Sequence, residues 1–348
     1  MPNIYVRNVS EGLYVGLMHL RDNGIWQESR SGRVIEFPTP IMTVYQQPEE
    51  RVLFYPERDA NPFFHLFEAL WMLGGRNDLE YVRQFNSRME EFSDDGQTLY
   101  GAYGYRWRNY FKKDQLTSLV THLKREPNSR RAVLQMWDSE DLEKIICDTS
   151  SKDLPCNTQV YFKIKGGRLQ MTVCCRSNDI IWGTYGANAV HFSILQEYVA
   201  ARVGVPMGTY YHLSDSFHAY EMVFEKSLKI LDQRNTGDSL WYDSYLGWNK
   251  GMHYSPEPMF TEPESIDKDL ETFLSSDHKY DEPPEHFSYK NPFFKETAMP
   301  MLKAWHQHKE KNYRHALLLM QNVQALDWKK AATEWLERRR RKWDYTKR

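Results

Sequence analysis

The first part of the chain alternates between extended patterns and one strongly apolar helical pattern. Residues 33–46 and 50–56 carry β-branched and aromatic side chains at alternating positions, which is typical of strands. Residues 62–75 are apolar on nearly every face, so we expect a deeply buried helix there. Asn61 is a suitable N-cap before Pro62 in the first turn, and a pair of glycines ends the segment.

The middle of the chain predicts further helices and strands. An amphipathic helix is expected at residues 113–125 and a strongly apolar one at 189–204. Strand-like patterns occupy residues 130–137, 158–165, 169–176 and 208–220. Two glycines between the second and third of these strands predict a hairpin turn. Strands interspersed with long helices indicate the α+β class.

The chain changes character after about residue 225. Residues 255–295 are rich in Pro, Glu, Asp and Ser, which favours irregular surface structure. Residues 297–342 show two amphipathic helical patterns and end in the basic run 338–342. Helix C-termini favour cations, so we expect this run to be a solvated helix end. The predicted domains are therefore a core of residues 1–225 and a divergent, largely helical region of residues 226–348 packed on that core.

Composition indicates a soluble globular protein. The 348 residues include 45 Lys and Arg against 47 Asp and Glu, a near balance that does not suggest a nucleic-acid coat or a membrane-surface protein. No apolar run approaches the ~20 residues of a membrane-spanning helix, and the N-terminus lacks a signal-peptide pattern. Four cysteines are too few for a disulfide framework and have no zinc-like spacing. We therefore expect no metal and a cytoplasmic location.

Cys156 is the first candidate for chemistry. It follows Pro155 at the start of a predicted strand, and clustered arginines stand on either side of it in the sequence, at 130–131 and at 176. Nearby positive charge stabilises a nucleophilic thiolate, and the guanidinium fork also matches a phosphate dianion. A cysteine nucleophile beside a phosphate site suggests a phosphorylated, electrophilic substrate. A small buried hydrophobe is the alternative for any single cysteine, and local sequence alone leaves both open.

These pieces belong to a longer ordered series of motifs. The chain contains, in order, an Arg-Ser-Gly loop at 30–32, FEALWML at 67–73, YGAYGYRWR at 100–108, NSRRAVLQMW at 128–137, LPCNTQVYF at 154–162, CRSNDIIWG at 175–183, GAN at 186–188 and SDSFHAY at 214–220. The series resembles the thymidylate synthases and the related pyrimidine-nucleotide hydroxymethylases. The resemblance implies a thymidylate synthase-like fold: a mixed twisted sheet packed with long buried helices, and a homodimer formed through the sheet. The part after about residue 225 does not resemble the family's usual C-terminus and would be a helical extension.

The resemblance assigns the central chemistry to four residues. Cys156 matches the nucleophile that adds to C6 of the pyrimidine, which makes C5 able to attack a one-carbon unit from 5,10-methylenetetrahydrofolate. Arg176 matches a phosphate ligand that also favours the thiolate. Glu68 matches the glutamate that organises water and relays protons, and its place in an apolar helix is unusual for a carboxylate. Tyr103 matches the tyrosine associated with removal of the C5 proton.

Further phosphate contacts are implied on both subunits. Arg30 resembles the arginine of a mobile loop, with Arg33 as a possible substitute. Arg130 and Arg131 match the pair that reaches into the partner's site, which would make the protein an obligate homodimer. Solvated surface charges are the alternative for this pair.

Other matches concern the sugar, the cosubstrate and the base. His218 and Tyr220 match the pair that binds the sugar 3′-hydroxyl, and Ser177 is typical of enzymes acting on deoxynucleotides. The residues that match the folate site are Asp179, Trp182 and Gly183.

Three departures from the family pattern bear on the product and the base. Met89 takes the place of a tryptophan that excludes water from the exocyclic methylene intermediate, so water could reach that carbon and give a hydroxymethyl product. Asn157 replaces the usual histidine after the nucleophile, near the pyrimidine C4 substituent. Asn188 aligns with the family's base-recognising asparagine only if this chain has one extra residue before it. In an alignment without that insertion, Ala187 takes the place. The chain also lacks the family's apolar closing tail, because it ends in WDYTKR.

We expect a homodimeric one-carbon transferase with 5,10-methylenetetrahydrofolate as cosubstrate. The favoured reaction is hydroxymethylation of dCMP, because resemblance is closest to the hydroxymethylase branch. The alternatives are dUMP hydroxymethylation, thymidylate synthesis from dUMP, and CMP hydroxymethylation. Asn188 favours the first of these, because an asparagine at this place in the family recognises uracil. Outside this class, an inactive relative could bind nucleic acid through the basic run 338–342, but retention of the whole catalytic set argues against such a partner.

Overall fold

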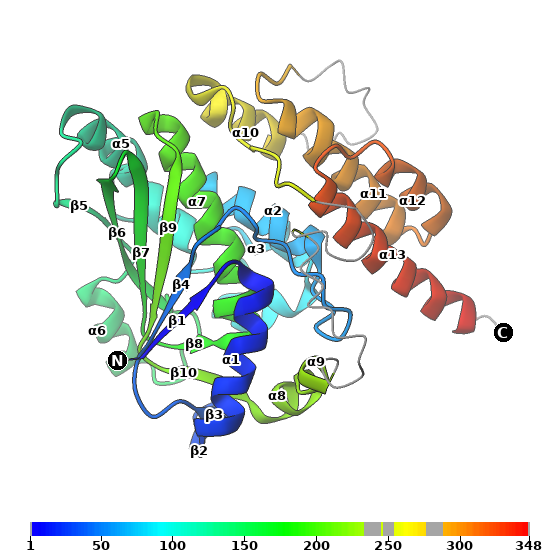
Figure 1. Ribbon diagram of the computed structural model, residues 1–348, viewed down its shortest axis with the longest axis horizontal. Helices are drawn as coiled ribbons and strands as arrows, with labels where there is room; N and C mark the ends of the chain where they lie inside the picture. The colour runs from blue at the N-terminus through cyan, green and yellow to red at the C-terminus, as the bar shows by residue number, and fades with distance from the viewer. Residues whose placement is uncertain (1, 233–244, 246–253, 276–287, 347–348) are drawn as a thin grey trace.

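Two mixed sheets organise the part of the chain that the computed structural model describes, residues 2–232, 245, 254–275 and 288–346 (Figure 1). The larger sheet has the strand order β1-β4-β9-β7-β6-β5, and the smaller one β2-β3-β10-β8. The larger sheet comprises β1 (Asn3–Val6), β4 (Ile41–Tyr45), β9 (Met207–Ser214), β7 (Arg168–Cys175), β6 (Asn157–Lys165) and β5 (Ala132–Gln135). The smaller sheet comprises β2 (Ile25–Ser29), β3 (Gly32–Glu36), β10 (Phe217–Tyr220) and β8 (Asn178–Asp179).

The predicted hairpin forms within the larger sheet, between β9 and the edge strand β5. β6 and β7 pair antiparallel, while β7 pairs parallel with β9 on its other side. Gly166 and Gly167 make the turn with φ values of 59° and 71°, which a residue without a Cβ adopts at little cost. The hairpin sets the position of the site, because Cys156 immediately precedes β6 and Arg176 immediately follows β7.

The single strand predicted at 208–220 is two strands in different sheets. β9 ends at Ser214 beside β7, and β10 begins at Phe217 between β3 and β8. The polar residues between them bend the chain from one sheet into the other. The break places the second half of the segment, with His218 and Tyr220, in the smaller sheet rather than the larger one.

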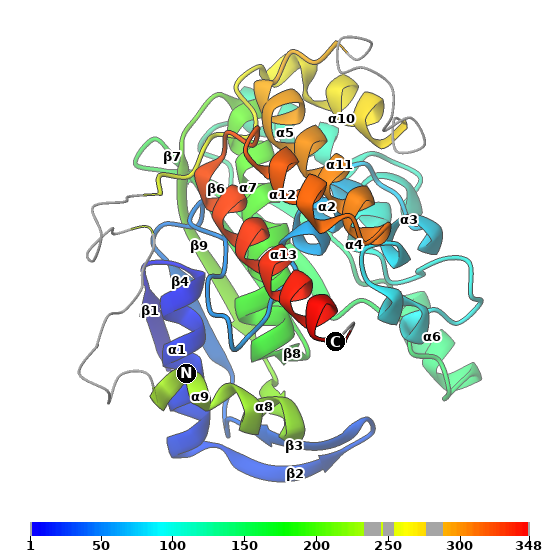
Figure 2. The same ribbon diagram turned by 90° about the vertical axis from the view of Figure 1, so that its right-hand side faces the viewer.

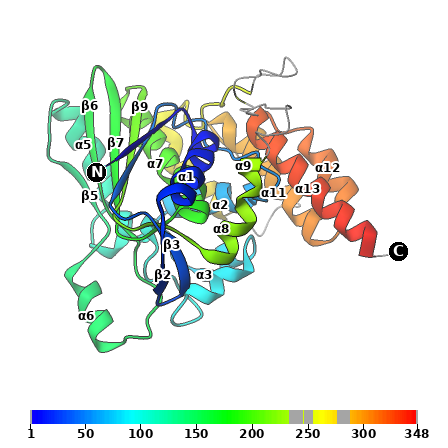
Figure 3. The same ribbon diagram turned by 60° about the horizontal axis from the view of Figure 1, so that its bottom comes forward.

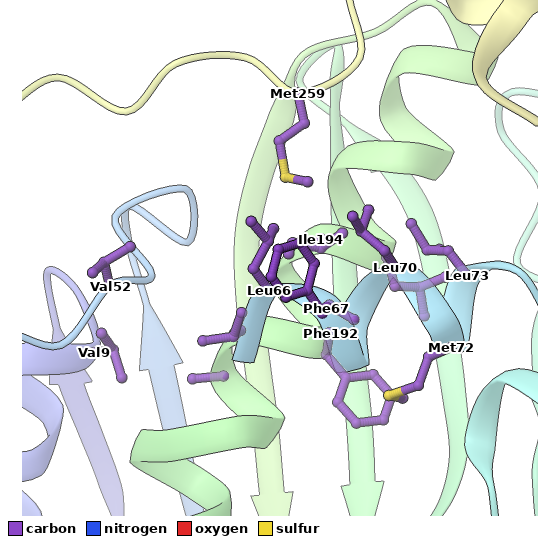
Figure 4. Packing of buried hydrophobic residues seen from close by; sticks show 14 of the residues in the cluster. Val9, Val52, Leu66, Phe67, Leu70, Met72, Leu73, Phe192, Ile194 and Met259 are labelled. Atoms are coloured by element: carbon purple, nitrogen blue, oxygen red, sulfur yellow. The ribbon is translucent and has the colours of Figure 1, made fainter. Parts of the chain in front are cut away.

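Long helices cover one face of the larger sheet. α1 (Val9–Asn23) contacts β1 and β4, α5 (Gln115–Arg125) contacts β5, and α7 (Asn188–Val203) contacts β7 and β9. α2 (Pro62–Leu73) packs on α7, and Figure 4 shows side chains of both helices together in the core. Asn61 caps α2 as predicted, because its side chain accepts from two backbone N–H groups of the first turn.

Shorter helical elements join these strands and long helices. They are α3 (Leu79–Arg83), η1 (Ser87–Phe92), α4 (Tyr103–Tyr105), η2 (Arg106–Tyr110), α6 (Ser139–Cys147), η3 (Ile180–Ala187), α8 (Glu221–Ser227) and α9 (Lys229–Asp232). Figure 3 shows α6 and the β2–β3 hairpin in the lower part of the view. The predicted α+β class is confirmed.

Two expectations for the N-terminal part were wrong. Residues 50–56 form no strand, because their polar groups bind side chains instead of a neighbouring strand. The Arg51 side chain pairs with Glu197 at 2.6 Å, and the Val52 backbone N–H donates to the Tyr245 hydroxyl. Helix α1 was not predicted, although Asn8 caps it. Its two interior glycines weaken the helical signal, and both are needed because a Cβ at either would meet the Tyr185 ring within 2.6 Å.

The C-terminal region contains more helix than the sequence pattern predicted. Residues 255–295 include η5 (Pro263–Ser265) and α10 (Ile266–Ser275), whose Leu270 and Phe273 are buried, so the expectation of irregular structure was wrong there. After η8 (Phe294–Ala298), three helices rather than two follow: α11 (Met299–Lys309), α12 (Tyr313–Met320) and α13 (Leu326–Thr346). Lys311, at a φ of 62°, breaks the first pattern in two. α11 and α13 pack against α2 (Figure 2); the domain division at residue 225 stays a prediction.

Part of the basic run 338–342 is not a free solvated face. Arg338 Nε lies 3.0 Å from Asp59 Oδ1, and Arg339 Nη2 lies 2.8 Å from Asp59 Oδ2. The Arg339 guanidinium also stacks 4.2 Å from the Trp335 ring. These contacts tie α13 to the turn that precedes α2, because one carboxylate binds two guanidinium groups.

Candidate active site

A cavity of about 1060 Å³, the site cavity, lies between the turn of the β2–β3 hairpin and the loop that follows α6. Its volume is at the upper end for small-molecule sites. The predicted site residues that line it are Arg30, Glu68, Met89, Tyr103, Cys156, Arg176, Ser177, Asn188, His218 and Tyr220. Segments far apart in the sequence thus meet at one place. Those that do not line it are Arg130, Arg131, Asn157, Asp179, Trp182 and Gly183.

Cys156 and Arg176 are held together by the ends of β6 and β7. The Arg176 N–H donates to the Cys156 carbonyl at 2.9 Å, and its Nε donates to the Pro155 carbonyl at 3.1 Å. Arg176 Nη2 then lies 3.9 Å from Cys156 Sγ. Burial raises the pKa of the Cys156 thiol, while Arg176 and Arg30 oppose that increase. The arrangement provides a desolvated thiol with a cation in position to stabilise its thiolate.

Arg30, rather than Arg33, points toward the site cavity. Arg30 is at the β2–β3 turn, and its Nη1 donates to the Ser151 carbonyl across the cavity mouth at 3.0 Å. Arg33 instead pairs with Glu221 at 2.6 Å and stacks on the Trp26 ring. Arg30 and Arg176 therefore supply two guanidinium groups to one end of the cavity, an arrangement suited to a phosphate.

Arg130 and Arg131 are remote from the site cavity of their own chain. They precede β5, whose first residue Ala132 pairs with Phe162, the sixth residue after Cys156 along β6. At the rise of an extended strand, that separation is roughly 20 Å. Both side chains are exposed, and Arg131 binds Glu126 at 2.6 Å. They cannot act on a ligand beside the cysteine of the same chain.

Asn157 belongs to a buried chain of hydrogen bonds behind the cavity wall. Its Nδ2 donates to Asn188 Oδ1 at 3.2 Å, and Asn188 Nδ2 donates to Asn178 Oδ1 at 3.1 Å. Asn157 Oδ1 lies 3.2 Å from His212 Nε2, while His212 Nδ1 lies 2.8 Å from the Tyr210 hydroxyl. Burial lowers the pKa of His212 to about 3, so the ring is neutral. With the ring hydrogen on Nε2, the ring donates to Asn157 Oδ1, and Asn178 Nδ2, which lies 3.1 Å from the same ring nitrogen, donates to Ser214 Oγ at 2.9 Å. Asn157 and Asn178 thus hold the Asn188 amide from two sides.

The extra residue before Asn188 is accommodated by a kink. Tyr185 and Gly186, inside η3, have non-helical backbone angles, and α7 starts directly afterwards. Ala187 also lines the cavity, but Asn188 carries the polar atoms of the network. A Cβ at Gly183 would lie 2.5 Å from Asn178 Oδ1 and 3.0 Å from Asn188 Nδ2. Glycine at this position therefore makes room for the hydrogen-bond network. A contact of Gly183 with the folate cosubstrate stays a prediction.

The β10 strand directs two predicted sugar ligands into the cavity. His218 and Tyr220 are two residues apart, so their side chains lie on the same face of the strand. His218 Nδ1 is 3.0 Å from Ser216 Oγ, which orients the imidazole. Ser177 lines the cavity beside them.

Two buried polar groups face the cavity from the helical side. The Tyr103 hydroxyl lies 3.4 Å from the Asn157 backbone N–H, and burial raises the pKa of Tyr103 well above its usual value. Tyr103 is therefore a neutral hydrogen-bond donor. Glu68, on α2, lies 3.0 Å from His191 Nε2 on α7. His191 was not predicted from the sequence.

The predicted folate residues lie around and behind one rim of the cavity. Met89 lines the cavity on η1, and the preceding Arg88 stacks 4.6 Å above the Trp182 ring. Asp179 does not face the cavity; its carboxylate accepts from the backbone N–H groups of Ile181 and Trp182 and caps η3. Burial raises the pKa of Asp179 although these hydrogen bonds oppose the increase.

Asp153 is a second cavity residue that sequence patterns missed. Its carboxylate accepts from the Gly101 N–H at 2.8 Å and from the Tyr100 N–H, so it joins the YGAYG segment to the loop before Cys156. Burial raises the pKa of Asp153 to about 6 in spite of these bonds. Its only signal was its place three residues before the nucleophile.

The site cavity brings a thiol beside two guanidinium groups, as an enzyme acting on a phosphorylated substrate requires, and comparison with known proteins identifies the family. Residues 17–240 match the family described as Thymidylate synthase, and the chain belongs to it. The chain is 48% identical over 349 residues to a protein of Pseudomonas phage M6 named deoxyuridylate hydroxymethyltransferase, covering 98% of this chain and 95% of that protein.

Two further relatives are similar to part of the chain. A protein of the same name from Bacillus phage SP01 is 37% identical over 199 residues, or 54% of this chain and 51% of that protein. A putative thymidylate synthase of Methanothermobacter thermautotrophicus (strain Delta H) is 38% identical over 232 residues, 66% of this chain and 98% of that protein. The predicted family and enzyme class are thereby confirmed.

The family transfers a one-carbon unit from methylenetetrahydrofolate to a pyrimidine nucleotide. Among the described residues, no group of three or more His, Cys, Asp or Glu side chains could hold a metal ion. No helix in the same residues is long and apolar enough to cross a membrane.

Proposed function

We propose that this protein hydroxymethylates C5 of dUMP. The observation that carries the proposal is the similarity, over nearly the whole of both chains, to a protein named deoxyuridylate hydroxymethyltransferase. The dCMP specificity expected from the sequence has no support in the comparisons, and the proposal adopts the dUMP alternative.

The held orientation of Asn188 supports uracil as the base. Uracil needs an acceptor for N3–H and a donor for O4, and one amide offers both. Cytosine needs the reverse pattern, for which the Asn188 amide would have to turn over. With Asn157 and Asn178 oriented as they are, that turn would bring Asn188 Nδ2 against Asn157 Nδ2 and Asn188 Oδ1 against Asn178 Oδ1. Both contacts would be repulsive and buried, which is costly.

The remaining roles follow the positions of the side chains. Cys156 adds to C6, Arg30 and Arg176 bind the phosphate with Ser177, and His218 and Tyr220 bind the sugar. Tyr103 helps to remove the C5 proton. Methylenetetrahydrofolate supplies the one-carbon unit when bound. An apolar wall suits its flat ring system; the wall comprises Trp71, Met72, Met89, Phe92 and Leu99. Asp179, Trp182 and Gly183 are proposed to hold its outer part.

A homodimer would complete the site. Arg130 and Arg131 lie too far from their own Cys156 to act there, so we propose that they reach the partner's phosphate site. Val133 and Tyr161 pair across β5 and β6 and are each more than 40% exposed, which suits burial in a sheet-mediated dimer. Nucleic-acid binding through the basic run 338–342 is disfavoured, because Arg338 and Arg339 already bind Asp59.

Incubation with methylenetetrahydrofolate and each of dUMP, dCMP and CMP tests the proposal. Mass spectrometry should find a product heavier by one formaldehyde unit from dUMP, at a rate at least ~10²-fold above that from dCMP. Asn188→Asp is the matched variant, because a carboxylate accepts from the cytosine amino group and repels O4 of uracil; it should shift the preference toward dCMP. Faster turnover of dCMP than of dUMP by the unaltered protein would contradict the proposed base.

Met89→Trp tests the water path. A tryptophan in the wall should exclude water from the methylene carbon, so the fraction of methyl product should rise from near zero to a readily detected share. Product masses and dihydrofolate formation measure that share. Met89→Leu is the control and should keep the hydroxymethyl product. A folded Met89→Trp protein with an unchanged product would refute this role of Met89.

A further inference from the structure

His191 is a buried ionisable residue in the site cavity to which the proposed function assigns no role. It lies three residues after Asn188 on α7, so both side chains face the cavity from one side of the helix. Its side chain is only 4% exposed, and that of Glu68 is 11% exposed. Most histidines on a buried helix pack as core side chains, but this one reaches the cavity surface beside a carboxylate.

The contact between His191 and Glu68 leaves hydrogen-bonding capacity on both groups. His191 Nε2 and Glu68 Oε2 lie 3.0 Å apart, yet the two are not aligned as a hydrogen bond. Neither atom has another hydrogen-bond partner within the described ranges of the chain. Buried polar atoms are rarely left unsatisfied, so the pair is arranged for a small polar molecule such as water.

The surrounding charges suit proton transfer at this pair. His65 faces His191 from α2, and burial together with Arg58 and His191 lowers the pKa of His65 well below its usual value. His65 is therefore neutral, and the Glu68 carboxyl group lies directly beside the His191 ring. A proton arriving on His191 would be stabilised by the Glu68 carboxylate next to it.

We propose that His191, paired with Glu68, is the base that activates the water added to the exocyclic methylene carbon. The inference rests on the proposed hydroxymethylation. The water oxygen bonds to the methylene carbon, the water proton moves to His191 Nε2, and the double-bond electron pair moves onto C5 and O4. That pair then returns to form the C5–C6 double bond, the C6–Sγ bond breaks, and Cys156 leaves as a thiolate. His191 afterwards releases its proton to solvent through Glu68.

His191→Gln in the full chain tests the inference under single-turnover conditions, with dUMP tritiated at C5 and methylenetetrahydrofolate. Tritium release reports the steps before water addition and should stay within several-fold of the unaltered protein. Hydroxymethyl formation should fall about 100-fold, since general-base catalysis commonly contributes 10²–10⁴. A thiol added to the reaction should then trap the methylene carbon as a thioether.

Two further variants separate catalysis from structure. His65→Gln replaces a neighbouring buried histidine that does not line the cavity, and it should leave the ratio of the two rates unchanged. His191→Ala should regain hydroxymethyl formation when imidazole is added. An equal fall of both rates in His191→Gln, or no fall in either, would overturn the role of His191. A methyl product from the unaltered protein would overturn the proposed function itself, and the inference with it.

Discussion

Replacement of Cys156 by serine is expected to lower turnover of dUMP by at least ~10³-fold, because the hydroxyl is a far poorer nucleophile than the thiolate. The protein should still fold and bind dUMP, since the side chains differ by one atom. Initial rates and the mass of a denatured enzyme–nucleotide adduct measure the effect. The adduct should be present with the unaltered protein and absent with the variant.

Cys174→Ser is the matched control. Cys174 is on β7 close to the same region, is only half-buried and does not line the site cavity. The Cys174→Ser protein should turn over dUMP within about twofold of the rate of the unaltered protein, as expected for a substitution away from the reacting groups. A Cys156→Ser protein that retained a tenth of the activity would refute covalent catalysis by this residue.

The pH dependence of adduct formation should reflect the same environment. Because burial raises the pKa of Cys156 above the usual thiol value, the thiol predominates at neutral pH. The rate should therefore rise with pH as the thiolate fraction grows. Arg176→Leu should move that rise to higher pH, since it removes the cation 3.9 Å from the sulfur.

Asp141→Ala is expected to destabilise the folded protein by about 3–5 kcal/mol, since it leaves a buried guanidinium without its counter-ion. Arg106 and Asp141 are fully buried and joined by two hydrogen bonds of 2.7 and 2.8 Å. Arg106 also donates to the Met136 carbonyl and stacks between Tyr100 and Tyr110. The pair joins the YGAYGYRWR segment to α6, so its loss should also loosen the loop that leads to Cys156.

Urea unfolding measures this loss. Arg83→Ala is the control, because its ion pair with Glu90 is about half exposed on both sides and should contribute under ~1 kcal/mol. A loss below ~1 kcal/mol in Asp141→Ala would contradict the structural role assigned to the buried pair.

The sequence predicted those helices and strands whose capping and turn residues are adjacent to the element itself. Asn61, Pro62 and the following glycines define α2, and the glycine turn defines the β6–β7 hairpin. The strand at 208–220 could not be divided from its pattern alone, because β9 and β10 alternate alike and differ only in the sheet they join. Tertiary contacts likewise decide the helicity of α10, whose buried face lies against α2.

The residues of the candidate site likewise fall into those that sequence motifs identified and those that only the fold reveals. Motifs singled out Cys156, Arg176 and Asn188, whose meeting in one cavity depends on the ends of distant strands and helices. His191 carried no such signal, because a histidine in an apolar helix looks like a core residue until its neighbour across the fold is known. Arg30 and Arg33 were equivalent in sequence, and the ion pair of Arg33 with Glu221 distinguishes them.

The oxygen source of the product tests the account most directly. The reaction with dUMP and methylenetetrahydrofolate would be run in water enriched in ¹⁸O, and the nucleotide product and the folate would be analysed by mass spectrometry. The account predicts a hydroxymethyl nucleotide carrying ¹⁸O, with tetrahydrofolate recovered. A methyl nucleotide without the label, accompanied by dihydrofolate, would contradict it.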